Sequence, residues 1–246
     1  AFDCYGSIKD INYINYDDVL NEYSNFKRRE KVLLSNFYYE NMRDINSLKT
    51  YKSVDKNLIY EEKIFNTYDK ECKVHYQNTN QIVILIGNKT CSCKNNEFIN
   101  LKILESYLAF GMSSKLFRIF REKKGLTYDV GVFNPLRKSS SPFLIYLSSS
   151  PKNCLATFKD LLKLWNQITS EKLTQKELDL AKIKLRAALA LSCQTTEEVI
   201  NKKVQLIGLK VDPKSNESFV EKISKIKSDE ILETAKKYLL KPFLSI

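Results

Sequence analysis

The sequence predicts an α+β domain in which one mainly antiparallel sheet is backed by long helices. In the larger part of the chain, strand-like segments come first and helical segments follow in blocks, with few short strand–helix–strand crossovers. The hydrophobic content of 43% is normal for a globular core. The length of 246 residues suggests one large domain or two small ones.

Three regions are predicted along the chain. Residues 1–50 are expected to be the tail of a preceding domain. Residues 51–72 are polar, charged and weakly periodic, which indicates a linker with some apolar anchors. Residues 73–246 are expected to form the second domain. Because the chain starts at Ala1 and ends as an apolar run begins, we expect it to be a piece of a longer protein.

The first region is expected to contain three short elements. Residues 17–26 have helical spacing, with apolar side chains three or four positions apart. Residues 31–37 contain an apolar run typical of a strand. Residues 39–48 are consistent with a short helix.

The predicted sheet begins after residue 73. Residues 81–87, QIVILIG, are almost continuously apolar, so a central strand is expected. The segment FLIYL at 143–147 suggests a strand buried on both faces. Two further strands are expected at 74–77 and 128–133.

A long helical region is expected at 98–123. Gly111 interrupts it and marks a bend or a helix break. Its apolar residues recur at helical spacing: Leu101, Leu104, Leu108, Met112, Leu116 and Phe120.

Helices dominate the rest of the chain. Pro151 suits the first position of a helix. Capping boxes at Thr174–Glu177 and Thr195–Glu198 begin two more helices, and Ser228 begins the last. The pair at 212–213, Asp-Pro, breaks the chain between these pieces. The apolar face of the first of these helices is expected to contain Leu155, Phe158, Leu162, Trp165 and Ile168.

The formal net charge is +11, and a basic surface can bind nucleic acid or an acidic membrane. The lysines, however, are scattered over the polar faces of predicted helices. The basic runs Lys27–Arg29 and Arg121–Lys124 lack the aromatic interleaving of a single-strand groove. No apolar run approaches the roughly 18 residues of a membrane span. We therefore expect no nucleic-acid partner and no membrane span. A nucleic-acid-binding module is the third hypothesis, and only the net charge suggests it.

Catalytic chemistry is scarce in the sequence. The single histidine, His75, lies in a strand-like segment and is expected to be structural. A catalytic zinc site usually needs two or more histidine ligands. Because H-E-x-x-H and its inverted form each contain two histidines, neither motif can occur in this sequence. There is no G-x-S-x-G nucleophile elbow and no Gly-rich phosphate loop. We expect no catalytic residue and no metal site in this chain.

Six cysteines occupy positions 4, 72, 91, 93, 154 and 193. Cys91 and Cys93 are too close for the usual C-x-x-C zinc knuckle. Cys154 and Cys193 lie among apolar helical residues, where a buried, reduced thiol is expected. This pattern favours an intracellular, reducing compartment.

One turn carries the candidate binding residues. Arg121 lies in the last turn of the predicted helix, Gly125 permits a tight turn, and Tyr128 opens the next strand. Around such a turn the guanidinium and the phenol can reach the same point, where they would suit carbonyl oxygens of a bound peptide or a developing oxyanion. The alternative is structural: Arg121 is then a solvated helix-end charge and Tyr128 an ordinary core residue.

Residues 111–131, GMSSKLFRIFREKKGLTYDVG, resemble a known motif. It is the S-S-R-L-F-x-x-(I/V/L)-R-E-x-x-G-L-x-Y-x-V segment of the M16 (insulinase, pitrilysin and mitochondrial processing peptidase-like) metallopeptidases. The segment lies in the second, zinc-less half of those proteins. Residues 81–87 resemble the first core strand of that half, 174–189 resemble its T-x-x-E-L-x-x-A-K helix, and 5–26 resemble the end of the first half.

The resemblance implies the M16/LuxS-like metallohydrolase fold, with two similar α+β halves that form a clamshell. In active members a zinc site in the first half cleaves unfolded peptides, and an Arg and a Tyr from the second half hold the substrate backbone. Those two positions match Arg121 and Tyr128. The peptide would add to a sheet edge. The implied partners are thus an unfolded peptide substrate and either an N-terminal M16 half or a partner subunit. A dimer is one form that the second kind of partnership would take.

The sequence departs from the family pattern in two places, and only the second bears on function. Lys115 replaces the more usual Arg of S-S-R-L-F, which leaves the implied function intact. The zinc motif is absent, so zinc is expected only in a missing N-terminal half or in a partner subunit, and this chain alone is expected to be inactive. The chain would then be the substrate-binding half of a zinc endopeptidase or of its zinc-less partner; the alternative is a non-catalytic structural or assembly protein with the same fold.

Overall fold

The computed structural model describes residues 7–28, 80–212 and 215–246. The chain falls into two units, Ala1–Lys73 and Val74–Ile246. The following predictions lie outside the described residues: the strands at 31–37 and 74–77, the helix at 39–48, the linker at 51–72, and His75.

The described part of the first unit consists of two helices. They are α1 (Ile8–Tyr13) and α2 (Tyr16–Arg28), and α2 confirms the helix predicted at 17–26. A capping box begins α1, because the Ser7 hydroxyl accepts the Asp10 N–H at 3.1 Å and the Asp10 carboxylate accepts the Ser7 N–H at 3.0 Å.

The second unit is built on an antiparallel sheet. In the described part of the chain the strand order is β2-β3-β1-β4. The strands are β1 (Ile82–Lys89), β2 (Thr127–Phe133), β3 (Pro142–Ser149) and β4 (Phe243–Ser245). Because β1 pairs with β3 on one side and β4 on the other, the apolar run at 81–87 forms the predicted central strand.

The helices of this unit are α3 (Glu97–Ala109), the π-helix η2 (Phe117–Lys123), the 3₁₀ turn η3 (Pro151–Asn153), α4 (Cys154–Ser170), α5 (Gln175–Leu191), α6 (Thr196–Gly208), α7 (Ser215–Lys225) and α8 (Ser228–Leu239).

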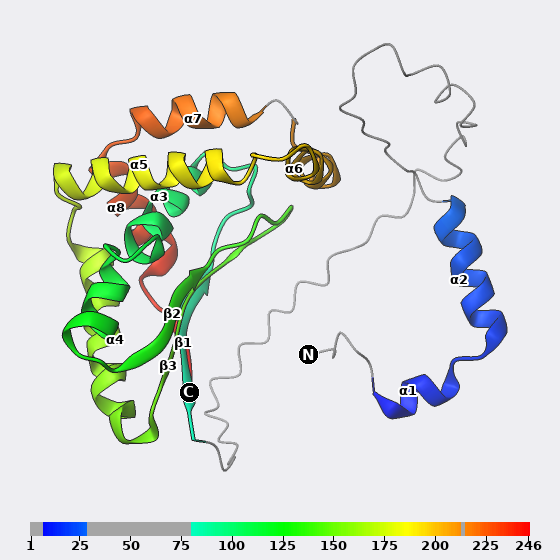
Figure 1. Ribbon diagram of the computed structural model, residues 1–246, viewed down its shortest axis with the longest axis horizontal. Coiled ribbons are helices and arrows are strands. Elements are labelled where there is room, and N and C mark those ends of the chain that lie inside the picture. The colour runs from blue at the N-terminus through cyan, green and yellow to red at the C-terminus, as the bar shows by residue number, and fades with distance from the viewer. Residues whose placement is uncertain (1–6, 29–79, 213–214) are drawn as a thin grey trace. The chain divides into compact units, whose positions relative to one another are not determined.

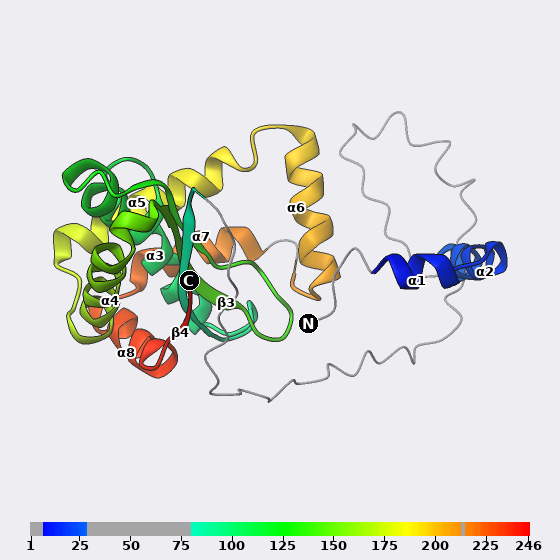
Figure 2. The same cartoon turned by 90° about the horizontal axis from the view of Figure 1, so that it is seen from below.

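Helices α3, α4 and α8 cover one face of the sheet (Figure 1). α3 contacts β2, α8 contacts β1, and the Trp165 ring of α4 lies 6.4 Å from the Phe143 ring of β3. α5 and α7 pack against α3 as an outer layer, and α6 projects away from the body of the helices (Figure 2).

Local signals for helix starts are confirmed. The Thr174 hydroxyl accepts the Glu177 N–H at the start of α5, and the Thr195 hydroxyl accepts the Glu198 N–H at the start of α6. Gly111, with φ of +73, follows the end of α3 and produces the predicted break. A mainly antiparallel sheet backed by long helices is therefore the fold of this unit.

The burial of β3 differs from the prediction. Phe143, Ile145 and Leu147 are fully buried under the helices. Leu144 and Tyr146, which alternate with them, are only half-buried. The prediction that FLIYL is buried on both faces was wrong, because the helices of the described residues cover only one face of the sheet.

Two residues expected on apolar helix faces are exposed. Met112 is 75% exposed because Gly111 ends α3 and the helical phase is not carried across the break. Leu155 is 73% exposed. It lies ten residues before Trp165, which is not a whole number of turns at about 3.6 residues per turn, so it is out of phase with the buried face of α4. That face contains Leu161, Leu164 and the predicted Trp165 and Ile168. The predicted Phe158 and Leu162 are half-buried against the core.

The thiols also differ from expectation. Cys154 and Cys193 are half-buried rather than buried. Cys154 begins α4 and packs against the core with only part of its surface, and Cys193 lies in the turn after α5. Cys91 is buried, and burial raises the pKa of its thiol. All the described cysteines are free.

An ionic contact joins the start of α3 to the end of α8. The Glu97 carboxylate accepts hydrogen bonds from Lys237 Nζ at 2.8 Å and from the Tyr238 hydroxyl at 2.6 Å. Hydrogen bonds from Lys237 and then from Tyr238 hold the pKa of Glu97 below its ordinary value. Burial and the bond to Glu97 raise the pKa of Tyr238 to about 12, so this hydroxyl keeps its proton and remains a donor.

This contact predicts a pH dependence of stability. Since the folded pKa of Glu97 lies below its ordinary value of 4.5, the carboxylate stabilises the fold above pH 4.5 and loses that contribution as pH falls through the folded pKa. The difference in unfolding free energy between wild type and Glu97→Gln should be largest at neutral pH and shrink in acid. Urea denaturation at several pH values measures it. Glu122→Gln is the control, because this exposed carboxylate has no ion pair with a described residue, and an equal pH response of both variants would contradict the assignment.

Candidate functional site

The candidate site is the turn that joins η2 to β2. Leu116, just before η2, and Phe120 within it are fully buried and anchor the segment to the core, whereas Phe117 is only half-buried. The sequence predicted an ordinary helix here, but residues Phe117–Lys123 form a π-helix. π-helical segments are rare in proteins, and those that occur often lie at functional sites.

Gly125 shapes the turn itself. Its φ is +58, in the left-handed region that a residue with a Cβ rarely adopts. The N–H of Leu126 then donates to the Phe120 carbonyl at 2.8 Å, which closes the turn back onto the end of the π-helix. A glycine at this position therefore fixes where the chain re-enters the sheet.

Hydrogen bonds hold the strand side of the turn. The Ser149 hydroxyl donates to the Leu126 carbonyl at 2.7 Å. The buried Thr127 hydroxyl lies against the carbonyl oxygens of Ser148 and Asp129, the latter at 2.7 Å. The start of β2 is thus pinned to β3, its neighbour in the sheet.

The pairing of β2 with β3 is irregular at Tyr128. The register shifts between Thr127 and Val130, as in a β-bulge. Bulges are frequent at sheet edges and beside active sites, where they redirect a side chain. Tyr128 lies within this irregularity and is 85% exposed, which excludes the alternative that it is an ordinary core residue.

Arg121 and Tyr128 stand exposed on the two sides of this turn. The Arg121 guanidinium lies 5.1 Å from the centre of the Phe117 ring, within the range of a cation–π contact. Neither side chain makes a hydrogen bond with any described residue, and they make none with each other. The donors of both side chains are therefore open to solvent in the described part of the chain.

An apolar sheet surface lies beside this edge. Phe133 pairs with Leu144, and Gly131 pairs with Tyr146, so these residues share the face that α3, α4 and α8 leave uncovered. A Cβ at Gly131 would come within 2.6 Å of the Tyr146 hydroxyl, so the Tyr146 side chain lies across the glycine. An extended chain that follows β2 would meet this surface with its side chains.

Metal ligands do not gather in the described residues. Residues 7–28, 80–212 and 215–246 contain no group of three or more His, Cys, Asp or Glu side chains that could hold a metal ion. Within the same residues, no helix is long and apolar enough to cross a membrane.

The sequence matches a family model at residues 35–185. This model describes the peptidase M16 inactive domain, and the match spans more than half of the chain. The chain belongs to this family. The resemblance of residues 111–131 to the zinc-less half of M16 peptidases is thereby confirmed.

Similar proteins support the same family, and the chain covers only part of their length. An uncharacterized zinc protease of Rickettsia felis is 35% identical over 130 residues, which is 52% of this chain and 31% of that protein. The chain thus spans about a third of that relative. The crystal structure of a protease from Helicobacter pylori matches 97% of this chain and 60% of its own, with a TM-score of 0.74 and 19% identity. A peptidase M16 inactive domain from Pseudomonas fluorescens matches 68% of this chain and 40% of its own, with a TM-score of 0.61 and 20% identity.

Part of this site could not be read from the sequence. The motif named Arg121, Gly125 and Tyr128, but the π-helix and the β-bulge were missed. The hydroxyls of Thr127 and Ser149, which pin the turn, were missed as well. A threonine directly after Gly-Leu and a serine at the end of an apolar strand are weak signals, because both residues are common in turns.

Proposed function

We propose that this M16 inactive domain holds an extended peptide for cleavage by a zinc-bearing half, on the same chain or on a partner subunit. One observation carries the proposal. Arg121 and Tyr128 flank a pinned turn at a sheet edge, both exposed and both without a hydrogen-bond partner among the described residues. Zinc would belong to the other half, and no step of the chemistry is assigned to residues of this chain.

The donors suit a peptide backbone. A guanidinium offers up to five N–H donors and a phenol offers one, whereas an extended peptide presents carbonyl oxygens at regular spacing. The apolar surface beside β2 would receive side chains without strict selection. A site of this kind reads little side-chain identity, which fits an unfolded substrate better than a folded one.

Rigidity supports the same role. The hydrogen bonds of Thr127 and Ser149 and the buried anchors Leu116 and Phe120 fix the backbone on both sides of the turn. A fixed turn lowers the entropy lost when a peptide binds. The turn is therefore suited to position a substrate as well as to attract it.

The test is the affinity of the chain for an unstructured peptide, measured by isothermal titration calorimetry. Arg121→Ala should weaken binding by about tenfold or more, as expected for loss of hydrogen bonds from a charged group. Tyr128→Phe should weaken it by about two- to tenfold, since one neutral hydrogen bond is lost.

Arg118→Ala is the matched control for this experiment. Arg118 is an exposed arginine of the same π-helix, so the variant removes the same charge one turn away. Its affinity should stay close to wild type. If Arg118→Ala and Arg121→Ala weaken binding equally, the effect is one of overall charge and the proposed clamp is wrong.

A further inference from the structure

A cavity that the peptide site does not use opens between α3 and the helices α5, α6 and α7. Its volume is about 400 Å³, and side chains of α3, α5, α6 and α7 line it. Neither Arg121 nor Tyr128 is part of the lining. Small-molecule sites typically measure roughly 300–1,000 Å³, so the cavity has the size of a ligand site.

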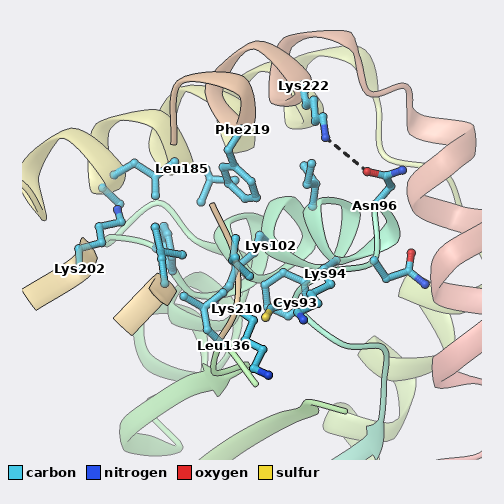
Figure 3. A pocket seen from close by; sticks show the side chains of 18 residues that line it. Cys93, Lys94, Asn96, Lys102, Leu136, Leu185, Lys202, Lys210, Phe219 and Lys222 are labelled. Atoms are coloured by element: carbon cyan, nitrogen blue, oxygen red, sulfur yellow. Dashed lines mark hydrogen bonds between the residues drawn. The ribbon is translucent and has the colours of Figure 1, made fainter. Parts of the chain in front are cut away.

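The walls of this cavity are apolar. Phe98 of α3, Leu185 of α5 and Leu206 of α6 are buried there, and Phe219 of α7 closes one side (Figure 3). No aspartate or glutamate is among the described residues that line it. The interior therefore favours a hydrocarbon group over a polar one.

Lysines from different segments surround the apolar walls (Figure 3). Among them, Lys102 forms an ion pair with a carboxylate of its own helix, at 2.8 Å. The remaining four form no ion pair with any described residue: Lys94, Lys202, Lys210 and Lys222. Lys202 donates to the Ser192 hydroxyl at 3.2 Å, which leaves its charge uncompensated. Four such charges around one cavity create a positive potential that an anion would neutralise.

Lys210 occupies a backbone conformation that disfavours it. Its N–H donates to the Ile207 carbonyl at 2.8 Å, and the Val211 N–H donates to the Leu206 carbonyl at 2.9 Å, which is the pattern that ends many helices. The residue at this position is usually glycine, because its φ is positive. Lys210 has φ of +56. A glycine would relieve the strain but would remove an ammonium group from the rim of the cavity.

We propose that this cavity binds an amphiphilic carboxylate of the fatty-acid type. The hydrocarbon tail would lie against Phe98, Leu185 and Leu206, and the carboxylate would lie at the rim near Lys202 and Lys210. If each tail group takes about 30 Å³, the share of one liquid water, the cavity holds on the order of a dozen groups. A medium-chain fatty acid therefore fits the volume, the apolar walls and the charge together.

The test is calorimetric titration of the 246-residue chain with dodecanoate, decanoate and octanoate below their micelle concentrations. If the tail is buried, each pair of methylenes removed should weaken binding by about tenfold or more. Dodecanol, which has the same tail but no charge, should bind at least about tenfold more weakly than dodecanoate.

Variants locate the binding in this cavity. Ala188→Phe fills the cavity and should abolish dodecanoate binding, whereas Ala187→Phe, on the exposed side of the same helix, should not. Lys210→Gly should weaken binding several-fold while the melting temperature stays unchanged or rises. Lys203→Gln, next to the cavity lysine of α6 but outside the lining, is the charge control.

Other outcomes of these experiments would contradict the proposed fatty-acid site. Equal binding of dodecanol and dodecanoate would remove the role of the lysines. If dodecanoate still binds to Ala188→Phe, its site is not this cavity. If dodecanoate does not bind to the wild-type chain, the proposal is wrong. Binding of an acidic amphipathic peptide in the absence of any fatty-acid binding would make the cavity a protein-docking groove and overturn the proposal.

Discussion

Trp165→Ala is expected to lower the free energy of unfolding of the Val74–Ile246 unit by about 3–5 kcal/mol. Trp165 is 1% exposed and packs edge-on against Phe143 of β3. Its indole N–H donates to the Leu239 carbonyl at 2.7 Å, at the end of α8. Removal of the ring therefore leaves a cavity between α4 and the sheet and also leaves a buried carbonyl without its donor.

The measurement is urea denaturation followed by circular dichroism, since Trp165 is the only tryptophan and its loss removes the fluorescence signal. Trp165→Phe should lose less stability than Trp165→Ala, because most of the ring remains. Leu155→Ala on the same helix is the control and should change stability by less than about 0.5 kcal/mol, as is usual for surface substitutions. If the two alanine variants were equally stable, the described packing of α4 would be wrong.

Gly87→Ala is expected to destabilise the fold by about 1–3 kcal/mol through overpacking. Gly87 lies in the central strand β1, opposite Leu144 of β3. A Cβ at this position would lie 2.3 Å from the Phe143 carbonyl oxygen and 2.8 Å from the Leu144 Cα. Both are backbone atoms, so the clash cannot be relieved by a side-chain rotation and the two strands must separate.

Gly208→Ala is the matched control for this substitution. Gly208 ends α6, and a Cβ there would meet no atom within 4 Å. Alanine is favoured over glycine in a helix by roughly 0.5–1 kcal/mol, so this variant should be unchanged or stabilised. Equal losses at both positions, measured by the same denaturation, would show that contact at Gly87 is not the cause.

Features set by neighbours in sequence could be predicted. The hydroxyls of Thr174 and Thr195 cap their helices because a capping box needs only residues three positions apart. The apolar run at 81–87 forms the central strand, as its short length and β-branched residues predicted. Residues 111–131 carry enough of a known motif to identify the family from the sequence alone.

Features set by long-range packing could not be predicted. Leu144 and Leu155 are apolar, yet whether they are buried depends on which face of the sheet and of α4 is covered. The register shift that exposes Tyr128 results from pairing with β3, about twenty residues away. The cavity that we propose as a fatty-acid site is lined by residues far apart in the sequence, from Cys93 to Lys222. No local sequence pattern predicts that Lys210, with its positive φ, lies at this cavity.

The central claim is that Arg121 and Tyr128 hold the same peptide. The most direct measurement is a double-mutant cycle, with peptide affinity determined for wild type, Arg121→Ala, Tyr128→Phe and the double variant. If both donors hold one backbone segment, each single change weakens binding and the double variant binds less weakly than the sum of the two free-energy losses predicts. If neither single change alters the affinity of a correctly folded chain, the peptide clamp is contradicted.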